Sequence, residues 1–400
     1  MPDFTITPDV IDHLALALVP GLGPKLTAAL LTRFGSAANA LRATAHELRE
    51  IPHIGDTLAQ SLAHAFRNMD TTSELELLQK HGVQPVPFGF PGYPSALACV
   101  PGPPPLLYFR GEWKEADLNA VGIVGSRSCT GYGLKVAGQL ARELARAGFT
   151  VISGLARGID AAAHRGALEG GGRTIAVMAG GLSKIYPPEH RDLAEEIAAD
   201  RGCLISETSM RMDPQPGMFP ARNRIISGLS KAIIVVEANA RSGALITAEH
   251  AAEQGREVYA VPGPVDSPSS AGCLGLIRNG ARLVRTADDV IEDLQGLRTV
   301  LEPRVGGRKV EESGDRRQKS EGTGDRSQET EKGDKEIANP KLPELSPTEQ
   351  RVFDALSNRR HADELSRELG LAVGELSRNL MHLELKKVVR RLPGNFYERR

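Results

Sequence analysis

Short hydrophobic runs alternate with amphipathic stretches through the middle of the chain. Runs rich in β-branched residues and bounded by Gly, Ser or Pro predict strands at 121–124, 150–152, 174–178, 203–206, 232–236 and 258–261. Apolar residues at helical spacing predict helices at 133–147, 159–168, 191–199 and 244–253. Strands that alternate with helices in this way are typical of βαβ units. The pattern therefore predicts a doubly wound α/β domain with a mostly parallel sheet.

The pattern changes on both sides of this region and divides the chain into five segments. They are a helical domain at 1–75, a Pro-rich and irregular connector packing on the core at 76–118, a Rossmann-like domain at 119–297, a charged linker at 298–344 and a second helical domain at 345–400. The linker has no aliphatic or aromatic side chain between Glu311 and Glu336. Burial cannot offset the entropy of ordering such a segment, so we predict that it is disordered.

The first segment contains an internal repeat, in which residues 19–30 align with residues 51–62 at an offset of 32. Each copy predicts a helix, a tight Gly turn and a helix, and His53 replaces the first turn Gly in the second copy. The repeat resembles a helix–hairpin–helix (SAM-like) tandem, which offers turn N–H groups to a DNA phosphate. Residues 1–75 have 5 basic and 8 acidic residues, which favours a packing or protein-contact role over DNA binding.

The last segment resembles a winged helix. A capping sequence, Ser346-Pro-Thr-Glu349, precedes predicted helices at 348–356, 362–369 and 373–387 and a small hairpin at 388–392 and 396–397. Its basic residues gather at the end of the chain and are Lys386, Lys387, Arg390, Arg391, Arg399 and Arg400. Both a DNA contact and a protein-docking role fit this segment.

The unusual residues of the α/β domain gather in the loops that follow its strands. Ligands of open α/β sheets bind beyond the carboxyl ends of the strands. Gly frees the backbone, Ser and Asn supply donors and acceptors, and Arg binds phosphate in a bidentate manner. The candidates for an anion site are Gly125, Ser126, Arg127, Ser153, Gly154, Arg157, Gly158, Arg222, Asn223, Arg224, Ser242, Gly243 and Thr247.

Composition indicates what kind of site this is. The net charge is −1, so no global basic field attracts DNA or a membrane. Only 4% of residues are aromatic, which favours phosphate contacts over base stacking. Between residues 118 and 296, 16 Arg and 3 Lys balance 19 acidic residues, and Arg gathered on one rim fits a focused phosphate-binding strip.

Catalytic motifs are scarce. Asp160 and His164 are four residues apart and share a helix face, but we interpret them as a structural pair because no nucleophile elbow accompanies them. No GxGxxG, Walker A or HExxH string occurs. We therefore expect neither a cofactor, a metal nor catalysis.

Cysteine usage and hydropathy predict a cytoplasmic protein. Its four cysteines form no CxxC pair, which fits a reducing compartment. The N-terminus lacks the basic start of a signal peptide. No run of about 18 apolar residues exists, so we expect no contact with a membrane.

Several strings together resemble the DNA-processing protein A (DprA/Smf) family over residues 85–295. They are Val124-Gly-Ser-Arg127, Ser153-Gly-Leu-Ala-Arg-Gly-Ile-Asp160, Ile185-Tyr-Pro187, Phe219-Pro-Ala-Arg-Asn-Arg-Ile-Ile-Ser-Gly-Leu-Ser230, Ser242-Gly-Ala-Leu-Ile-Thr247, Val261-Pro-Gly263 and Leu276-Ile-Arg-Asn-Gly-Ala281. The resemblance implies a homodimer, formed through the Rossmann-like domain, that binds single-stranded DNA and loads the RecA recombinase in natural transformation. It implies no turnover, and it adds Lys184 to the phosphate contacts.

Two other interpretations remain open. A nucleotide-processing enzyme, similar to phosphoribohydrolases of Rossmann-like fold, would carry a PGGxGTxxE string, which Pro262-Gly-Pro264 and Ser242-Gly-Ala244 do not reproduce. A scaffold whose modules only dock proteins is the other. Salt distinguishes the scaffold, because phosphate binding weakens with salt and apolar docking does not.

Overall fold

The computed structural model describes residues 6–301 and part of the C-terminal region. In that region the described positions are 347–356, 360–361, 365, 368–369, 371, 376, 379–380, 383, 386, 388–392 and 396–399. The chain divides into two compact units, residues 1–302 and residues 303–400, and each is described by itself. Helix α14 (Ala287–Leu301) continues into the segment where the linker was expected to begin. The rest of that expected linker lies outside the described residues.

A nine-stranded sheet organises the first unit, in the order β1-β2-β6-β5-β4-β3-β7-β8-β9. Its strands are β1 (Val83–Pro87), β2 (Leu106–Gly111), β3 (Ala120–Val124), β4 (Thr150–Ser153), β5 (Thr174–Val177), β6 (Gly202–Ser206), β7 (Ala232–Val235), β8 (Glu257–Ala260) and β9 (Arg282–Leu283). The neighbouring strands in the part of this order that runs β6-β5-β4-β3-β7-β8-β9 all pair in parallel, which confirms the predicted doubly wound sheet. The chain moves outward from β3 to β4 and from β7 to β8 in opposite directions, so the topological switch point lies between β3 and β7.

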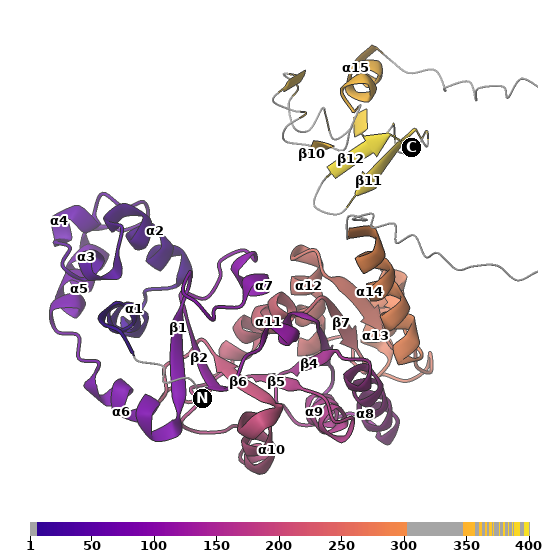
Figure 1. Ribbon diagram of the computed structural model, residues 1–400, viewed down its shortest axis with the longest axis horizontal. Helices are drawn as coiled ribbons and strands as arrows, with labels where there is room; N and C mark the ends of the chain where they lie inside the picture. The colour runs from indigo at the N-terminus through magenta and orange to yellow at the C-terminus, as the bar shows by residue number, and fades with distance from the viewer. Residues whose placement is uncertain are drawn as a thin grey trace, which may run out of the picture. The chain divides into compact units, whose positions relative to one another are not determined.

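Helices cover both faces of the sheet (Figure 1). Successive side chains of a strand point to opposite faces of the sheet, so both faces of β7 are apolar and need a cover. Ile234 packs with the helices of one face, and Ile233 and Val235 pack with those of the other. The first face carries α8 (Gly131–Arg146), α9 (Ile159–Glu169) and α14. The second carries α7 (Ser95–Ala98), α11 (Met218–Leu229), α12 (Gly243–Glu253) and α13 (Ala271–Arg278).

The Pro-rich connector is more regular than expected, which corrects the sequence-based interpretation. Its strands β1 and β2 extend the sheet, with β2 antiparallel to β6 and β1 antiparallel to β2. Pro85 and Pro87 are tolerated because β1 is an edge strand, where a missing N–H interrupts no further pairing. The segment also contains the end of α6 (Thr72–His81) and the 3₁₀ turn η1 (Glu115–Leu118).

Five short helices precede α6 and the sheet. They are α1 (Pro8–Leu18), α2 (Pro24–Phe34), α3 (Ala37–Leu41), α4 (Ala45–Leu48) and α5 (Asp56–Arg67). Leu16 and Leu30 are buried in a core of their own, whereas Leu14 is buried against Leu78 and the sheet. The helical segment is therefore attached to the α/β core through one side of α1.

The two turns of the repeat have the same backbone geometry. Gly23 and Gly55, which precede α2 and α5, have φ of −82° and ψ of 175° and 173°. At the first turn position Gly21 has φ of +79° and its counterpart His53 has φ of +69°. His53 therefore adopts a left-handed conformation that favours glycine.

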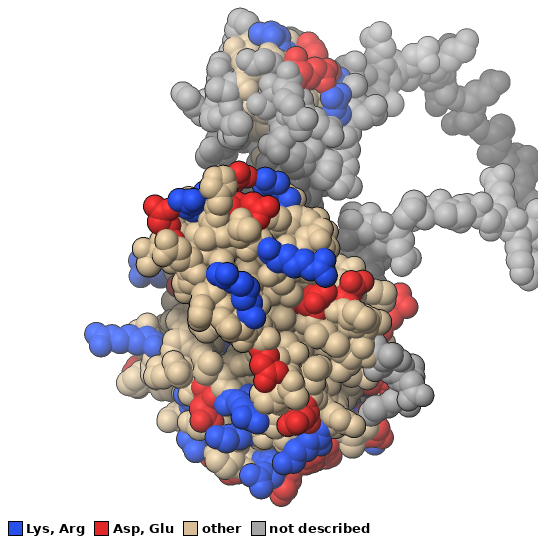
Figure 2. Space-filling model, turned by 90° about the vertical axis from the view of Figure 1, so that its left-hand side faces the viewer, with Lys and Arg blue, Asp and Glu red and all other residues tan. Residues whose placement is uncertain are grey.

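Charges of both signs mix on the surface of this helical segment. Figure 2 shows Lys and Arg side chains scattered among Asp and Glu on the face turned toward the viewer. Within the described residues, no helix combines the length and the apolar composition needed to span a membrane.

Three more short helices join β5 to β6, namely η2 (Pro188–His190), α10 (Arg191–Glu196) and the π-helical turn η3 (Ile197–Arg201). The second unit contains α15 (Pro347–Ala355) and an antiparallel sheet in the order β10 (Arg360–His361), β12 (Phe396–Arg399), β11 (Val389–Leu392). Strands β11 and β12 confirm the expected hairpin. Only separate positions of the helices expected at 362–369 and 373–387 are described, and Lys387 and Arg400 lie outside the described residues.

Substitutions at the two equivalent turn positions should change stability in opposite directions. Gly21→Ala places a Cβ on a left-handed residue and should lower the free energy of unfolding by about 1–2 kcal/mol. His53→Gly relieves the same strain and should raise it by less than about 1 kcal/mol, because glycine gains entropy in the unfolded chain. Urea unfolding of both variants checks this, and equal signs would contradict the assigned geometry.

Candidate anion-binding site at the carboxyl ends of the strands

An open cleft of about 360 Å³ lies at the switch point between β3 and β7. The loops after β3, β4 and β7 and the first turns of α11 and α12 form its walls. Its polar lining residues are Ser126, Arg127, Ser128, Asp160, Arg222, Asn223, Asn239, Ser242 and Thr247, with Gly125 and Gly243 between them. The structure thus brings most of the candidate residues together.

Two glycines let the first two loops approach each other closely. Gly158 has φ of +74°, and a Cβ there would lie 2.4 Å from the carbonyl oxygen of Ser126. A Cβ on Gly125 would lie 2.6 Å from Cγ1 of Ile159. The N–H of Ile159 donates to the carbonyl oxygen of Ser126 at 3.3 Å. The close contact holds Ser126 and Arg127 at the mouth of the cleft.

Arg222 is the most deeply buried charge of the site, with only 4% of its surface exposed. Its Nη1 donates to the carbonyl oxygens of Gly154, at 2.7 Å, and Val177, so it joins the ends of β4 and β5. A Cβ on Gly154 would lie 2.4 Å from Nη1, so only glycine leaves room for the guanidinium. Among the described residues, Nε finds no hydrogen-bond acceptor.

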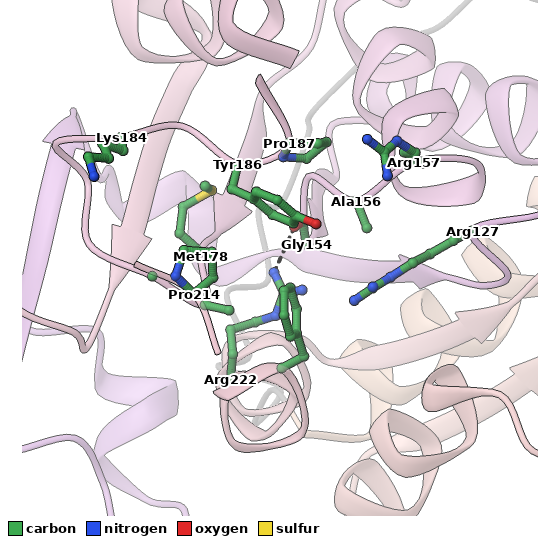
Figure 3. A pocket seen from close by; sticks show the side chains of 13 residues that line it. Arg127, Gly154, Ala156, Arg157, Met178, Lys184, Tyr186, Pro187, Pro214 and Arg222 are labelled. Carbon is green, nitrogen blue, oxygen red and sulfur yellow. Dashed lines mark hydrogen bonds between the residues drawn. The ribbon is translucent and has the colours of Figure 1, made fainter. Parts of the chain in front are cut away.

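Aromatic side chains extend the site beyond Arg222. The guanidinium of Arg127 lies 4.5 Å from the centre of the Phe219 ring, within cation–π range. The Phe219 and Tyr186 rings are 6.1 Å apart and inclined by 58°. Figure 3 shows Arg127, Tyr186 and Arg222 converging from three separate segments of the chain. This arrangement forms a continuous cationic and aromatic surface.

The electrostatics of the cleft favour an anion. Burial lowers the pKa of Arg222 to about 10, the charge of Asp160 raises it and the charge of Arg127 lowers it. Arg222 still carries its charge at neutral pH, so two guanidinium groups repel each other across the cleft. Burial raises the pKa of Asp160, and its carboxylate accepts N–H groups from Gly154 and Ala156 at 3.1 and 3.4 Å. An anion between Arg127 and Arg222 would relieve their repulsion.

Asp160 and His164 both hold the β4–α9 loop by separate hydrogen bonds. Nδ1 of His164 donates to the Thr174 hydroxyl at 2.7 Å, because that hydroxyl itself donates to the carbonyl oxygen of Val151. Nε2 then accepts the N–H of Leu155 at 3.3 Å. Each residue bonds the loop, and neither is placed as a catalytic partner of the other.

The carboxylate of Glu237 lies at the start of α8. The carboxylate of Glu237 accepts the N–H of Thr130 at 3.1 Å and its hydroxyl at 2.9 Å. The N–H of Ser126 donates to the carbonyl oxygen of Glu237 at 2.7 Å. Glu237 therefore occupies the positive end of α8. The first turn of α12, capped by Ser242, opens onto the cleft instead.

Besides Gly154 and Gly158, described above, four candidate residues do not line the cleft. Ser153 is buried and donates to the carbonyl oxygen of Ile123 at 2.6 Å. Arg224 pairs with Glu207 and donates to the carbonyl oxygen of Gly102 at 3.1 Å. A depression lies beside the cleft, and Arg157 and Lys184 line it. Both side chains are exposed and form ion pairs, Arg157 with Glu189 and Lys184 with Asp213.

Helical geometry explains the divergence of Arg222 and Arg224. Two residues correspond to about 200° of rotation in an α-helix, so their side chains leave opposite sides of α11. Phe219 is three residues before Arg222 and shares its face. Phe219 and Tyr186 were missed as site residues, although this spacing within a helix start was a readable signal for Phe219. Tyr186 offered no such signal, because only folding brings its loop to α11.

The fold and the cleft define an α/β protein with a cationic, aromatic-edged site at its switch point. In the described part of the chain, no group of three or more His, Cys, Asp or Glu side chains is placed to hold a metal. The family described as DNA recombination-mediator protein A matches residues 86–295, the DprA winged helix domain matches residues 336–395, and the SAM-like helix-hairpin-helix tandem matches residues 14–68.

Individual relatives agree with these family matches. The chain is 36% identical over 394 residues to the protein Smf of Synechocystis sp., covering 97% of this chain and 98% of that protein. It is 42% identical over 221 residues to the DNA processing protein DprA of Bacillus subtilis, covering 55% and 74%. The crystal structure of DNA processing protein A from Streptococcus pneumoniae matches 70% of this chain and 97% of that chain, with a TM-score of 0.63 and 32% identity. The chain belongs to the DprA/Smf family.

Burial of His164 should make stability depend on pH. Burial, then the charges of His190, Arg222 and Arg165, lower its pKa to about 3, below the ordinary 6.5. As the pH falls, the unfolded chain binds this proton before the folded protein does. The contribution of His164 to the free energy of unfolding is therefore complete above about pH 6.5, and it falls by up to about 1.4 kcal/mol per pH unit as the solution is acidified toward pH 3. The stability difference between wild type and His164→Gln should shrink over this range, measured by urea unfolding. Exposed His46→Gln is the control, and a constant difference for His164→Gln would contradict the assignment.

Proposed function

We propose that the protein binds single-stranded DNA through the switch-point cleft and loads the RecA recombinase onto it. The observation that carries the proposal is the convergence of Arg127 and Arg222 beside Phe219 and Tyr186. Guanidinium groups bind phosphates, and aromatic rings stack on bases that are not paired. A single strand supplies both groups at once, whereas a duplex keeps its bases inside. The family description as a recombination mediator supports this choice.

Both side chains and main-chain groups of the protein make the proposed DNA contacts. Arg127, Asn223, Ser242 and the first turn of α12 at Gly243 bind phosphates within the cleft, with Gly125, Ser126 and Thr247 forming its walls. Arg222 supplies a buried positive charge from below. Arg157 and Lys184 extend the contact when phosphates replace their carboxylate partners, since exposed ion pairs are weak.

The biological role follows from this binding. We propose that the protein protects incoming strands in natural transformation and delivers them to RecA during homologous recombination. It acts in the cytoplasm as a homodimer formed through the Rossmann-like domain, and it acts without turnover. The structural use of Asp160, His164 and Glu237 supports a binding role, because their hydrogen bonds to the chain leave them poorly placed as acids or bases.

Arg127→Ala should weaken binding of oligo-dT by roughly tenfold or more, because a charged hydrogen bond to phosphate is lost. It should also reduce the slope of log affinity against log salt by about 0.7, the value for one phosphate of a single strand. Fluorescence anisotropy at two salt concentrations, with oligo-dT and the matching duplex, measures both. Arg165→Ala removes a charge that is also exposed, on α9, and is the control. Unchanged affinity in folded Arg127→Ala would remove the cleft from the proposal, and a screen for nucleotide hydrolysis would follow.

RecA loading should depend on the same cleft. The wild-type protein should shorten the lag before RecA hydrolyses ATP on strands already covered by a single-strand-binding protein, whereas Arg127→Ala should not. The reason is that a mediator has to hold the strand while RecA nucleates. A wild-type protein that binds the strand yet leaves the lag unchanged would limit the function to strand protection.

A further inference from the structure

A second groove continues from the cleft on the far side of Tyr186. Its volume is about 450 Å³, and it shares Lys184, Tyr186 and Pro214 with the depression beside Arg127. The remaining walls come from the end of α6, from β2 and from α10. The groove and the depression therefore adjoin, and the loop that carries Lys184 and Tyr186 lies between them.

Basic side chains from separate elements face this groove. They are His81 at the end of α6, Arg110 on β2, Lys184 on the loop and Arg191 at the start of α10. The acidic residues in the same wall are Glu195 and Asp213. Sequence reasoning did not group these residues, because about 110 positions separate the first from the last.

Two of the cations are held by exposed carboxylates. Arg110 donates to both oxygens of Glu195 at 3.0 and 2.5 Å, and Lys184 donates to Asp213 at 3.0 Å. The Glu195 side chain is 51% exposed and that of Asp213 is 67% exposed. Both carboxylates face water, so an entering phosphate can replace either of them while the carboxylate turns to the solvent. Arg191 is exposed and has no ion-pair partner among the described residues.

We propose that this second groove binds the sugar-phosphate backbone of the same single strand after it leaves the switch-point cleft, with Arg110 and Arg191 as its phosphate contacts. The inference rests on the proposed function, which supplies the strand. The groove lies next to the depression, and the depression lies next to the cleft. This arrangement favours a polyanion that extends from the cleft into the groove over a separate small ligand. Partial burial and the charges of Arg110 and Lys80 lower the pKa of His81, whereas the charge of Glu195 raises it.

Oligonucleotide length tests this proposal. Affinities are measured for oligo-dT from about 4 to about 16 nucleotides, the range of site sizes known for single-strand-binding folds. Arg191→Ala should weaken binding roughly threefold to tenfold and lower the salt slope by about 0.7 only for strands long enough to reach the groove. Glu195→Gln should tighten binding of those same strands, because it frees Arg110. A gain of affinity cannot arise from a damaged fold.

Matched controls lie on the α8–α9 face. Glu169→Gln frees Arg142 from a similar exposed ion pair, and Arg165→Ala removes an exposed arginine. Neither should change the affinity of any strand by the amounts expected in the groove. Effects of Arg191→Ala and Glu195→Gln that are absent, or equal at every length, would overturn the second groove. Loss of all length dependence together with an inert Arg127→Ala would instead overturn the proposed function.

Discussion

The guanidinium of Arg222 lies against the backbone of Gly154 and Val177, and the rest of the site depends on this contact. It joins the carboxyl ends of two parallel strands to the N-terminal part of α11. Burying a charge is costly unless hydrogen bonds and an opposite charge offset the loss of water. Two carbonyl oxygens and the nearby Asp160 provide that offset only in part, since Nε finds no acceptor among the described residues. The cleft therefore retains a positive potential that an anion can satisfy.

The acidic residues of the rim make this cationic cleft possible. Glu237 closes the start of α8, Asp160 binds the β4–α9 loop and Glu207 pairs with Arg224. Each carboxylate is used within the fold, so none faces Arg127 across the cleft as an ion-pair partner among the described residues. A neutral domain can thus present a local positive site, because its carboxylates bind helix starts, loops and other arginines instead of facing the cleft.

The aromatic edge and the second groove give the site a direction. Arg127, Phe219 and Tyr186 follow one another along the surface, and the groove beyond Tyr186 carries Arg110 and Arg191. A linear polyanion with exposed bases fits such a succession of charged and aromatic contacts better than a compact ligand does. The exposed ion pairs in the groove moderate its charge in the absence of a strand.

Much of the architecture was readable from the sequence, because hydrophobic period and turn residues act locally. The βαβ order, the repeat at 19–30 and 51–62 and the terminal hairpin all follow from such local signals. The same logic placed the candidate site on one rim, since all parallel strands end there. Only the tertiary structure decided which side chains face it. Rotation along α11 turns Arg224 away from Arg222, Glu237 reaches α8 across more than 100 residues, and Tyr186 meets Phe219 from another loop. Long-range packing sets such contacts, and no local pattern records them.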